Sequence, residues 1–449
     1  MTPGEVQKII DGLKSKKAPG IDGITAEHIK FGGEKLLEIL TCICNTITRT
    51  ECIPRQLKRG IIIPIPKGTK DVSIQNNNRG ITLVSVVVKI YQKAVLSRHL
   101  AWSDTHDKID DMQGVGQPKS SSIHTAWLLR ETVAANTEQD SSVYVALIDT
   151  TKAFDTVWVQ GLFQKLMVSN MDSKVWRILF KFYNDFRCSV QIGGVLSEWF
   201  KSGQGVHQGE PWSMYLYTKM INNLLVRLRS MKSAAKISLL YTGTPSYADD
   251  IAIVTLHKPL LQRLLDCAYE YSQKWRFEFN ASKTELIIFG KDLCPDLDIK
   301  LGGDVIKVKN GGWHMGVPLT DSAQYEAQCI QEKIDSGKRA YFSIQGLGNK
   351  YLPVPPVVSA KLYWSVCVPR MTHGLEISML SDSSMSKLEQ AHGHMAKCIQ
   401  GLPSQTPNSA CIAPLNWSTM EGYIDKLKIL FLWRLLLMTT NCIYKQVAI

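Results

Sequence analysis

The sequence predicts an α+β protein whose first two thirds mix strands with helices and whose last third is mainly helical. Before about residue 322, apolar runs typical of strands alternate with amphipathic patterns typical of helices. After that point the helical pattern continues to the end of the sequence. With 449 residues the chain can form about two to four packed units, which excludes a disordered tail, a collagen-like repeat and a small disulfide scaffold.

Composition narrows the class of protein further. Lys and Arg number 52 against 40 Asp and Glu, a formal net charge of +12 that favours a polyanionic partner. Eleven cysteines without a C-x-x-C pair indicate reduced thiols. The sequence has neither a signal-peptide pattern nor an apolar stretch of about 20 residues, so we expect an intracellular protein of the nucleus or cytoplasm with no membrane partner.

The first notable element is a basic segment from Arg49 to Lys70. Six basic residues stand there against Glu51, a pattern that by itself is typical of a solvated face. Within the segment, an apolar run over 60–68 is broken by Pro64 and Pro66, which predicts an edge strand leading into a turn. Helical patterns predict helices over 25–49, 82–100 and 123–136.

A buried strand and the carboxylate after it form the most informative segment. Residues 143–148 are a continuous apolar run, which predicts a buried strand ending at Asp149. A turn over 150–155 then leads into a helix marked by Trp158 and Leu162. A carboxylate at the exit of a buried strand is costly unless it is paired or binds a cation.

The elements after this segment follow from the same kinds of signal. They are a helix capped by Asp172, a hairpin turning at Gly193–Gly194, a glycine-rich loop over 203–211, a helix over 213–231, β structure over 236–254, a helix over 260–275, a strand over 285–289 and short β segments after Leu301.

Two acidic sites stand out, Asp149 and the pair Asp249-Asp250. An isolated Asp-Asp pair in a turn is usually turn chemistry. If adjacent strands of one sheet bring Asp149 and Asp249 together, their repulsion is tolerable with divalent cations between them, and Mg²⁺ suits such a site. Two ions about 3.5–4 Å apart would activate an attacking hydroxyl and stabilise a leaving pyrophosphate, which is phosphoryl transfer.

Ordered motifs carry a resemblance to a known family. They are 145–154, 205–213 and Tyr247-Ala248-Asp249-Asp250, flanked by Lys17 to Gly23, Pro64 to Lys67, Asn78 to Leu83 and Ser282 to Glu285. Over about residues 5–320 the sequence resembles reverse transcriptases of non-LTR (LINE-type) retrotransposons. The resemblance implies a right-hand polymerase with mixed fingers (1–140), an antiparallel-sheet palm (141–295), a primer-grip-like β segment (296–321) and a helical thumb with a C-terminal extension (322–449).

The same resemblance implies roles for individual residues. Asp149, Asp249 and Asp250 would be the catalytic and metal-binding carboxylates. The nucleotide-binding residues would be Lys67, Arg79, Phe154, Gln208, Gly209 and Lys283. Phe154 would exclude the ribose 2′-hydroxyl, with a plain core position as the alternative, and Asp155 would have a structural role at a helix start.

The implied activity is RNA-directed DNA synthesis. The enzyme would extend a DNA or RNA primer with dNTPs on an RNA template. Two Mg²⁺ ions, or Mn²⁺ in their place, would be its cofactors. A catalytically impaired remnant that only binds nucleic acid is the alternative, and an RNA-dependent RNA polymerase is a third reading. The oligomeric state is not predicted.

Several residues depart from the family pattern. Glu210 and Trp212 replace smaller or apolar residues in the glycine-rich loop, so we expect an extra charge and a bulky indole beside the nucleotide pocket. Pro245 occupies what should be a strand, and Trp313 to Val317 replace a primer-grip turn. With no endonuclease ahead of the fingers, these departures suggest a partial or degenerate copy.

Overall fold

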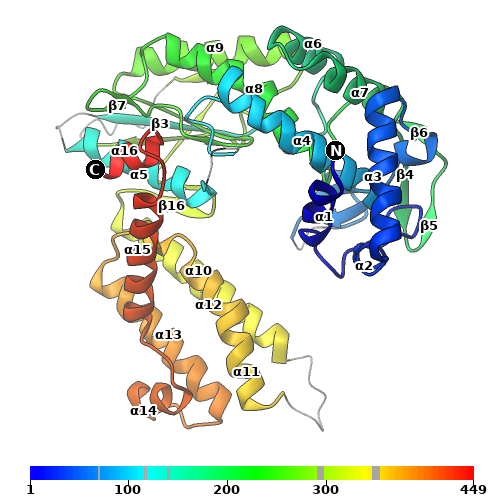
Figure 1. The fold of residues 1–449 in the computed structure, drawn as a ribbon. Helices are drawn as coiled ribbons and strands as arrows, with labels where there is room; N and C mark the ends of the chain where they lie inside the picture. The colour runs from blue at the N-terminus through cyan, green and yellow to red at the C-terminus, as the bar shows by residue number, and fades with distance from the viewer. Residues whose placement is uncertain (69–70, 116, 118, 139–141, 291–297, 346–353) are drawn as a thin grey trace. The chain divides into compact units, whose positions relative to one another are not determined.

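The computed structural model describes residues 1–449 except 69–70, 116, 118, 139–141, 291–297 and 346–353 (Figure 1). Lys70 of the basic segment therefore lies outside the described residues. The chain forms two compact units between which it passes several times. Unit 1 comprises Met1–Gly116, Thr150–Arg227 and Cys267–Phe279, and unit 2 comprises Gln117–Asp149, Leu228–Asp266 and Asn280–Ile449.

Unit 1 is built around a five-stranded sheet with helices beside it. Its helices are α1 (Pro3–Asp11), α2 (Ala26–Lys30), α3 (Gly33–Thr50), α4 (Val86–His106), α6 (Val159–Val168), α7 (Ser173–Asn184) and most of α8 (Ser213–Ser230), with short 3₁₀ turns at Arg55–Lys58 and Gln75–Asn77. Its strands are β1 (Arg59–Pro66), β2 (Asn78–Val84), β4 (Arg187–Ile192), β5 (Val195–Leu196) and β6 (Phe200–Lys201).

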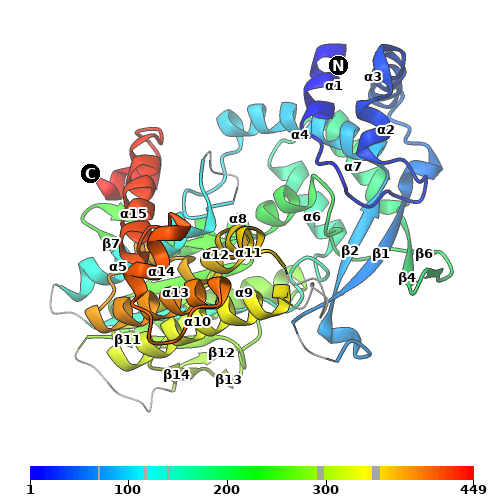
Figure 2. The same cartoon turned by 90° about the horizontal axis from the view of Figure 1, so that it is seen from below.

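The sheet of unit 1 joins segments that are far apart in the sequence. Strand β1 pairs antiparallel with β2 and parallel with β4, and β4 also pairs with β5 and β6. Figure 2 shows β1 and β2 as a long pair with β4 and β6 beside it. The predicted helix over 82–100 starts too early, because Thr82 to Val84 pair with β1 and Ser85 caps the helix that follows.

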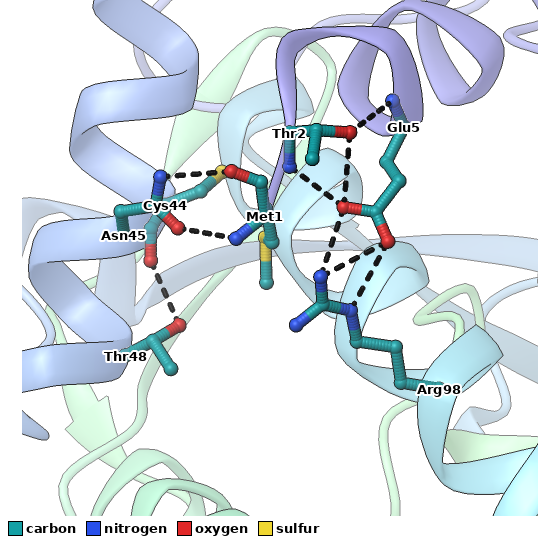
Figure 3. A network of polar contacts seen from close by, with 7 residues as sticks. All are labelled: Met1, Thr2, Glu5, Cys44, Asn45, Thr48 and Arg98. Carbon is teal, nitrogen blue, oxygen red and sulfur yellow. Dashed lines mark hydrogen bonds and ion pairs between the residues drawn. The ribbon is translucent and has the colours of Figure 1, made fainter.

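Polar contacts attach α1 to the helices next to it (Figure 3). Thr2 and Glu5 form a capping box at the start of α1. Glu5 also pairs with Arg98 of α4 at 2.9 Å, and these hydrogen bonds, first that from the Thr2 backbone, lower the pKa of Glu5 to about 2. The amide of Asn45 on α3 donates to the Met1 carbonyl oxygen at 3.0 Å.

Unit 2 contains the second five-stranded sheet, in the order β14-β11-β3-β10-β9. These strands are β3 (Val143–Ile148), β9 (Ser246–Tyr247), β10 (Asp250–Thr255), β11 (Glu285–Phe289) and β14 (Lys307–Lys309). All six residues of the central strand β3 are buried, as its continuous apolar run predicts. Residues of this sheet and of α5 (Ser122–Thr137) share one apolar core that includes Val145, Val254 and Leu129.

Short hairpins and a helical region complete unit 2. The remaining strands are β7 (Lys236–Ile237), β8 (Leu240–Tyr241), β12 (Lys300–Leu301), β13 (Asp304–Val305), β15 (Gly312–His314) and β16 (Val317–Leu319). The helices are the first half of α9 (Lys258–Trp275), then α10 (Ala323–Gln345), α11 (Pro356–Leu362), a π turn (Tyr363–Cys367), α12 (Val368–Thr372), a 3₁₀ turn (Leu375–Ile377), α13 (Asp382–Gln400), α14 (Asn408–Ile412), a 3₁₀ turn (Ala413–Leu415), α15 (Met420–Leu436) and α16 (Ile443–Ala448). The predicted change to helical structure near residue 322 is confirmed by α10.

The helical region has cores of its own. Helices α10, α12, α13 and α15 share one that includes Ile334, Met371, Leu388 and Ile424. None of the helices within the described residues has the combination of length and apolar character needed to cross a membrane.

Candidate active site

Asp149 and the Asp249-Asp250 pair come from neighbouring strands of the unit 2 sheet. Asp149 directly follows β3, and β10 begins at Asp250. The two strands pair antiparallel with Ile251 opposite Ile148, so the same register continued by one residue sets Asp250 opposite Asp149. The prediction that adjacent strands carry the two acidic sites is thus confirmed.

A tight turn presents the acidic pair. Ala248 has a positive φ of 57° between β9 and β10, and Asp249 follows it. Pro245 lies one residue before β9 and only its carbonyl is used, accepting from the Ala252 N–H at 3.1 Å. The expected conflict between this proline and the strand therefore does not arise, because the ladder needs no N–H at that position.

The carboxylates have the electrostatics of a site that attracts cations. Removal from water, and then the charges of Asp249 and Asp149, raise the pKa of Asp250 to about 6. The Oδ2 atom of Asp149 is buried and has no hydrogen-bond partner among the described residues. It is 3.5 Å from Nζ of Lys283, a side chain that is itself mostly exposed. The Lys283 ammonium offsets part of the charge of this oxygen but makes no hydrogen bond to it, and a metal cation at this place would supply the missing contact.

An open pocket of about 390 Å³ contains these groups. Its lining includes Asp149 and Asp250 but not Asp249. On its other sides are Lys283, Trp313 and His314. The His314 ring is buried, its Nε2 has no hydrogen-bond partner in the described part of the chain, and burial lowers its pKa to about 4. His314 is therefore neutral at pH 7, with one ring nitrogen left, among the described residues, without a hydrogen bond inside the wall of the pocket.

The donor set suits a hard divalent cation that keeps other oxygen ligands. Within the described residues no three Asp, Glu, His or Cys side chains come close enough to hold a metal by themselves. Mg²⁺ is normally held by one or two carboxylates, with water and substrate phosphates completing its octahedron. Asp149, whose Oδ2 has no hydrogen bond to a described residue, and the neighbouring Asp250 would supply the one or two carboxylates of such a site. The described residues do not form a closed cage that could bind a metal without water or substrate oxygens.

Most of the predicted nucleotide-binding residues lie in unit 1. Lys67 directly follows β1 and its Nζ donates to the Asn76 carbonyl at 3.1 Å, while Arg79 stands on β2 opposite Ile65. Desolvation raises the pKa of Asp155, and the charges of Lys152, Lys67 and Arg79 act in the opposite direction. Lys67 and Arg79 of unit 1 are therefore close enough to Asp155 for their positive charges to act on its carboxylate.

The loop that contains Gln208 and Gly209 packs on strand β2. The Thr82 N–H donates to the Gln208 carbonyl at 2.7 Å, and the Gln208 amide reaches the Asp155 carboxylate at 3.5 Å. Gly209 has a φ of 113°, and a Cβ there would lie 2.8 Å from the Thr82 carbonyl oxygen. Only glycine fits this close approach of two backbones.

Phe154 is half-buried rather than a full core residue. Its ring stacks on Tyr217 of α8 with centroids 4.8 Å apart and planes 22° apart. Its carbonyl accepts from the Val206 N–H at 2.8 Å, which ties the turn ahead of α6 to the glycine-rich loop. Asp155 sits in the turn ahead of α6, whose N-cap is Trp158, so the expected role of Asp155 at the helix start is wrong.

Glu210 and Trp212, the two residues of the glycine-rich loop that differ from the family pattern, are core residues. The Glu210 side chain is fully buried, accepts from the Tyr183 hydroxyl at 3.1 Å and lies 3.0 Å from His207 Nδ1. Trp212 is fully buried and its indole N–H donates to the Gln92 carbonyl at 3.0 Å. The expectation that both would crowd the nucleotide pocket is wrong, because partners on α7 and α4 draw them inward.

Sequence reasoning did not identify His314 and the Glu285–Lys309 ion pair as pocket residues. Glu285, Lys309 and His314 all line the pocket, and Lys309 pairs with Glu285. The signal that could have found Glu285 is its position as the last residue of the Ser282 to Glu285 motif. Its partner could not be found, since β14 joins β11 by a pairing that only the fold defines.

Comparison with known proteins gives relatives among mobile elements. The sequence is 22% identical to the RNA-directed DNA polymerase from mobile element jockey of Drosophila melanogaster, over 90% of this chain and 44% of the relative. It is 26% identical to the Pol polyprotein from type-2 retrotransposable element R2DM of the same species, over 88% of this chain and 37% of the relative. The chain thus spans less than half the length of these relatives.

Solved structures and a family model complete the comparison. An apo telomerase structure from Candida tropicalis aligns with a TM-score of 0.42 and 15% identity, over 92% of this chain and 74% of that one. The model of the family described as reverse transcriptase (RNA-dependent DNA polymerase) matches residues 65–327. This range is more than half of the chain and contains the whole sheet that carries Asp149 and Asp250. The helices and sheets of the two units agree with the predicted α+β class. By the match of this model, the chain belongs to the reverse transcriptase family.

Proposed function

We propose that this protein is an RNA-directed DNA polymerase that extends a primer 3′-hydroxyl with dNTPs. One observation carries the proposal: the unsatisfied Oδ2 of Asp149 stands beside Asp250 in an open pocket, at the ends of adjacent strands. Family membership supports the same chemistry. A pocket that sets two carboxylates side by side and still has room for a ligand suits phosphoryl transfer with divalent cations.

Within this proposal Asp149 and Asp249 hold two Mg²⁺ ions, with Mn²⁺ as a substitute, and Asp250 supports them. The ions, when bound, would lower the pKa of the primer hydroxyl and stabilise charge on the pyrophosphate. The primer 3′-hydroxyl gives its proton to solvent water and its oxygen forms a bond to the α-phosphorus, while the bond from that phosphorus to the bridging oxygen breaks. Lys283, whose ammonium is mostly exposed beside Asp149, donates a proton to the leaving pyrophosphate.

Unit 1 supplies the contacts that we assign to the incoming nucleotide. Lys67 and Arg79 bind its triphosphate, for which an ammonium and a forked guanidinium are suited. Gln208 and Gly209 lie against the nascent base pair, and Phe154 excludes a ribose 2′-hydroxyl. The fingers, palm, primer-grip-like and thumb assignments over 1–140, 141–295, 296–321 and 322–449 belong to the same proposal.

A groove in unit 2 is the place that we propose for the primer strand. It measures about 790 Å³ and is bordered by the β15–β16 hairpin and helices α10 and α12. Its basic lining residues are Lys333, Arg339 and Arg370. The Lys333 ammonium lies 5.2 Å from the centroid of the Trp313 ring, and Trp313 also lines the carboxylate pocket. The positively charged groove and the carboxylate pocket thus share Trp313. This arrangement suits a primer strand whose phosphates lie in the groove and whose 3′-hydroxyl reaches the carboxylates.

Primer extension on a primed RNA template tests the proposal. We expect dNTP incorporation that requires Mg²⁺ or Mn²⁺ and is abolished by Asp249→Asn. The matched control is Asp298→Asn, an exposed aspartate of unit 2 outside the pocket, which should keep full activity. Absence of incorporation by well-folded protein, with salt-dependent RNA binding retained, would support the binding-only remnant instead. A preference for NTPs over dNTPs would support an RNA polymerase.

A further inference from the structure

A row of three basic side chains crosses the sheet of unit 1. Arg59, the first residue of β1, is the register partner of Arg187, the first residue of β4. Arg187 is in turn the register partner of Lys201 on β6. All three side chains are exposed. Like charges directly opposite each other on paired strands destabilise a sheet, so this row costs stability unless an anion binds it.

The protein itself offsets only part of this charge. The row borders a cavity of about 620 Å³ whose seven lining residues include five basic ones and a single acid, Asp185. The Asp185 carboxylate lies 2.8 Å from the Lys58 ammonium, and that hydrogen bond lowers its pKa. Four positive charges therefore remain around the cavity without a neutralising partner among its lining residues.

An indole completes the cavity. Trp199 is half-buried at its wall, and the Arg59 guanidinium lies 5.1 Å from the centroid of its ring. This contact orients one of the cations, since a guanidinium is attracted to an aromatic face. Cations that follow a backbone together with an aromatic ring are the combination with which proteins bind single-stranded nucleic acid.

We propose that this cavity, which we call the Arg187 site, binds the phosphodiester backbone of an unpaired nucleic-acid segment. Neighbouring strands are about 4.8 Å apart, so three cations on three strands extend over about 10 Å, a length that suits successive phosphates better than one anion. Arginine forks bind phosphate oxygens in pairs. The inference rests on the proposed function in one respect, that the occupant is an unpaired stretch of the RNA used as template. None of its residues lines the carboxylate pocket.

The test measures binding without catalysis, so that its failure is distinct from a failure of the polymerase proposal. The full chain carrying Asp249→Asn is titrated without dNTPs against labelled oligo(U) and oligo(dT) of about 12 nucleotides. Arg187→Gln with Lys201→Gln should weaken the binding of both oligonucleotides about tenfold or more. It should also lower the slope of log affinity against log salt by about 1.4, since each phosphate contact on a single strand contributes about 0.7.

Two further variants separate the cavity from general surface charge. Trp199→Ala should weaken binding at least about fivefold, as expected for loss of a stacked ring. Lys8→Gln with Lys174→Gln removes two exposed lysines of unit 1 outside the cavity and should have little effect on either affinity or slope.

The melting temperature and a mononucleotide complete the test. Removal of opposed like charges should leave the melting temperature of the Arg187→Gln, Lys201→Gln variant unchanged or higher. Oligonucleotide binding that survives this variant, or that falls equally in the lysine control, overturns the inference. Competition by ATP as strong as that by an oligonucleotide overturns it too, because the site would then bind a free triphosphate.

Discussion

Asp149 and Asp250 face each other across two antiparallel strands, one position beyond the Ile148–Ile251 pair. Each occupies the place where its strand meets the open pocket. Strand β3 is buried and central in its sheet, and β10 is buried after Asp250, so the core fixes the backbone from which both carboxylates extend. The sheet thus holds two like charges together at a cost that ligand binding would recover.

Asp250→Asn should therefore stabilise the metal-free protein while it impairs activity. The substitution removes a carboxylate whose pKa is raised to about 6 by desolvation and its acidic neighbours, so repulsion at neutral pH is relieved. Thermal denaturation in EDTA should give a higher melting temperature than wild type, and the gain should shrink in Mg²⁺. Primer extension should fall about tenfold or more. A lower melting temperature in EDTA would contradict this account, and Asp298→Asn serves as control.

Local sequence patterns predicted the strands of the site because each of these strands is determined by residues close to it in the sequence. A continuous apolar run sufficed for β3, and the predicted β structure over 236–254 contains β9 and all but the last residue of β10. Glu285 to Phe289 form β11 with the predicted bounds, and Asp172 caps α7 as expected, accepting from the Val175 N–H at 2.9 Å. In each case the deciding contacts lie within a few residues or follow from burial of a whole run.

Features that depend on distant contacts could not be predicted. Thr82 belongs to β2 because β1 pairs with it, whereas its local pattern continues into the helix. Trp212 points inward because the Gln92 carbonyl, 120 residues earlier, accepts its N–H. The basic row depends on a parallel pairing of β1 with β4, so only Arg59 belonged to the segment that the charge pattern marked. The interpretation of that segment as a solvated face was made without Arg187 and Lys201, which lie far from it in the sequence.

Lys165 gives a prediction about pH. Its ammonium is buried in unit 1, donates to the Met220 carbonyl at 2.5 Å and lies 3.8 Å from the centroid of the Trp275 ring. Desolvation, and then the charge of Lys274, lower the pKa of Lys165 to about 7 from 10.5. Between these values the unfolded chain binds more protons than the folded one. The free energy of unfolding should therefore rise with pH across that window, by at most about 1.4 kcal/mol per unit.

Urea denaturation of wild type and Lys165→Met across that pH range measures the effect. The variant should lose the rise, because methionine carries no proton, and should be the more stable protein near pH 7. Lys174→Met, at an exposed position on α7, should keep the wild-type dependence. Parallel curves for wild type and Lys165→Met would mean that the amine keeps its ordinary pKa.

Phe154→Ala should change sugar selectivity. In the proposed function the half-buried ring, supported by Tyr217 at 4.8 Å, stands where a ribose 2′-hydroxyl would project. Removing it should raise the ratio of NTP to dNTP incorporation about tenfold or more, since a steric barrier disappears while the phosphate contacts stay. Single-nucleotide extension with matched dNTP and NTP measures the ratio. If the melting temperature falls and the ratio stays constant, Phe154 is a packing residue only.

Glu210→Ala should destabilise unit 1 and weaken nucleotide binding indirectly. The Tyr183 hydroxyl and His207 would lose their buried partner, at a cost of about 2–4 kcal/mol. Glu210 directly follows Gly209, whose loop packs against the Thr82 carbonyl, so a looser core should raise the KM for dNTP more than it lowers kcat. Glu210→Gln keeps an acceptor oxygen and should have a smaller effect on stability, and exposed Glu198→Ala should have none. An unchanged melting temperature with tighter dNTP binding would instead place the Glu210 carboxylate in the nucleotide pocket, as the sequence pattern had suggested.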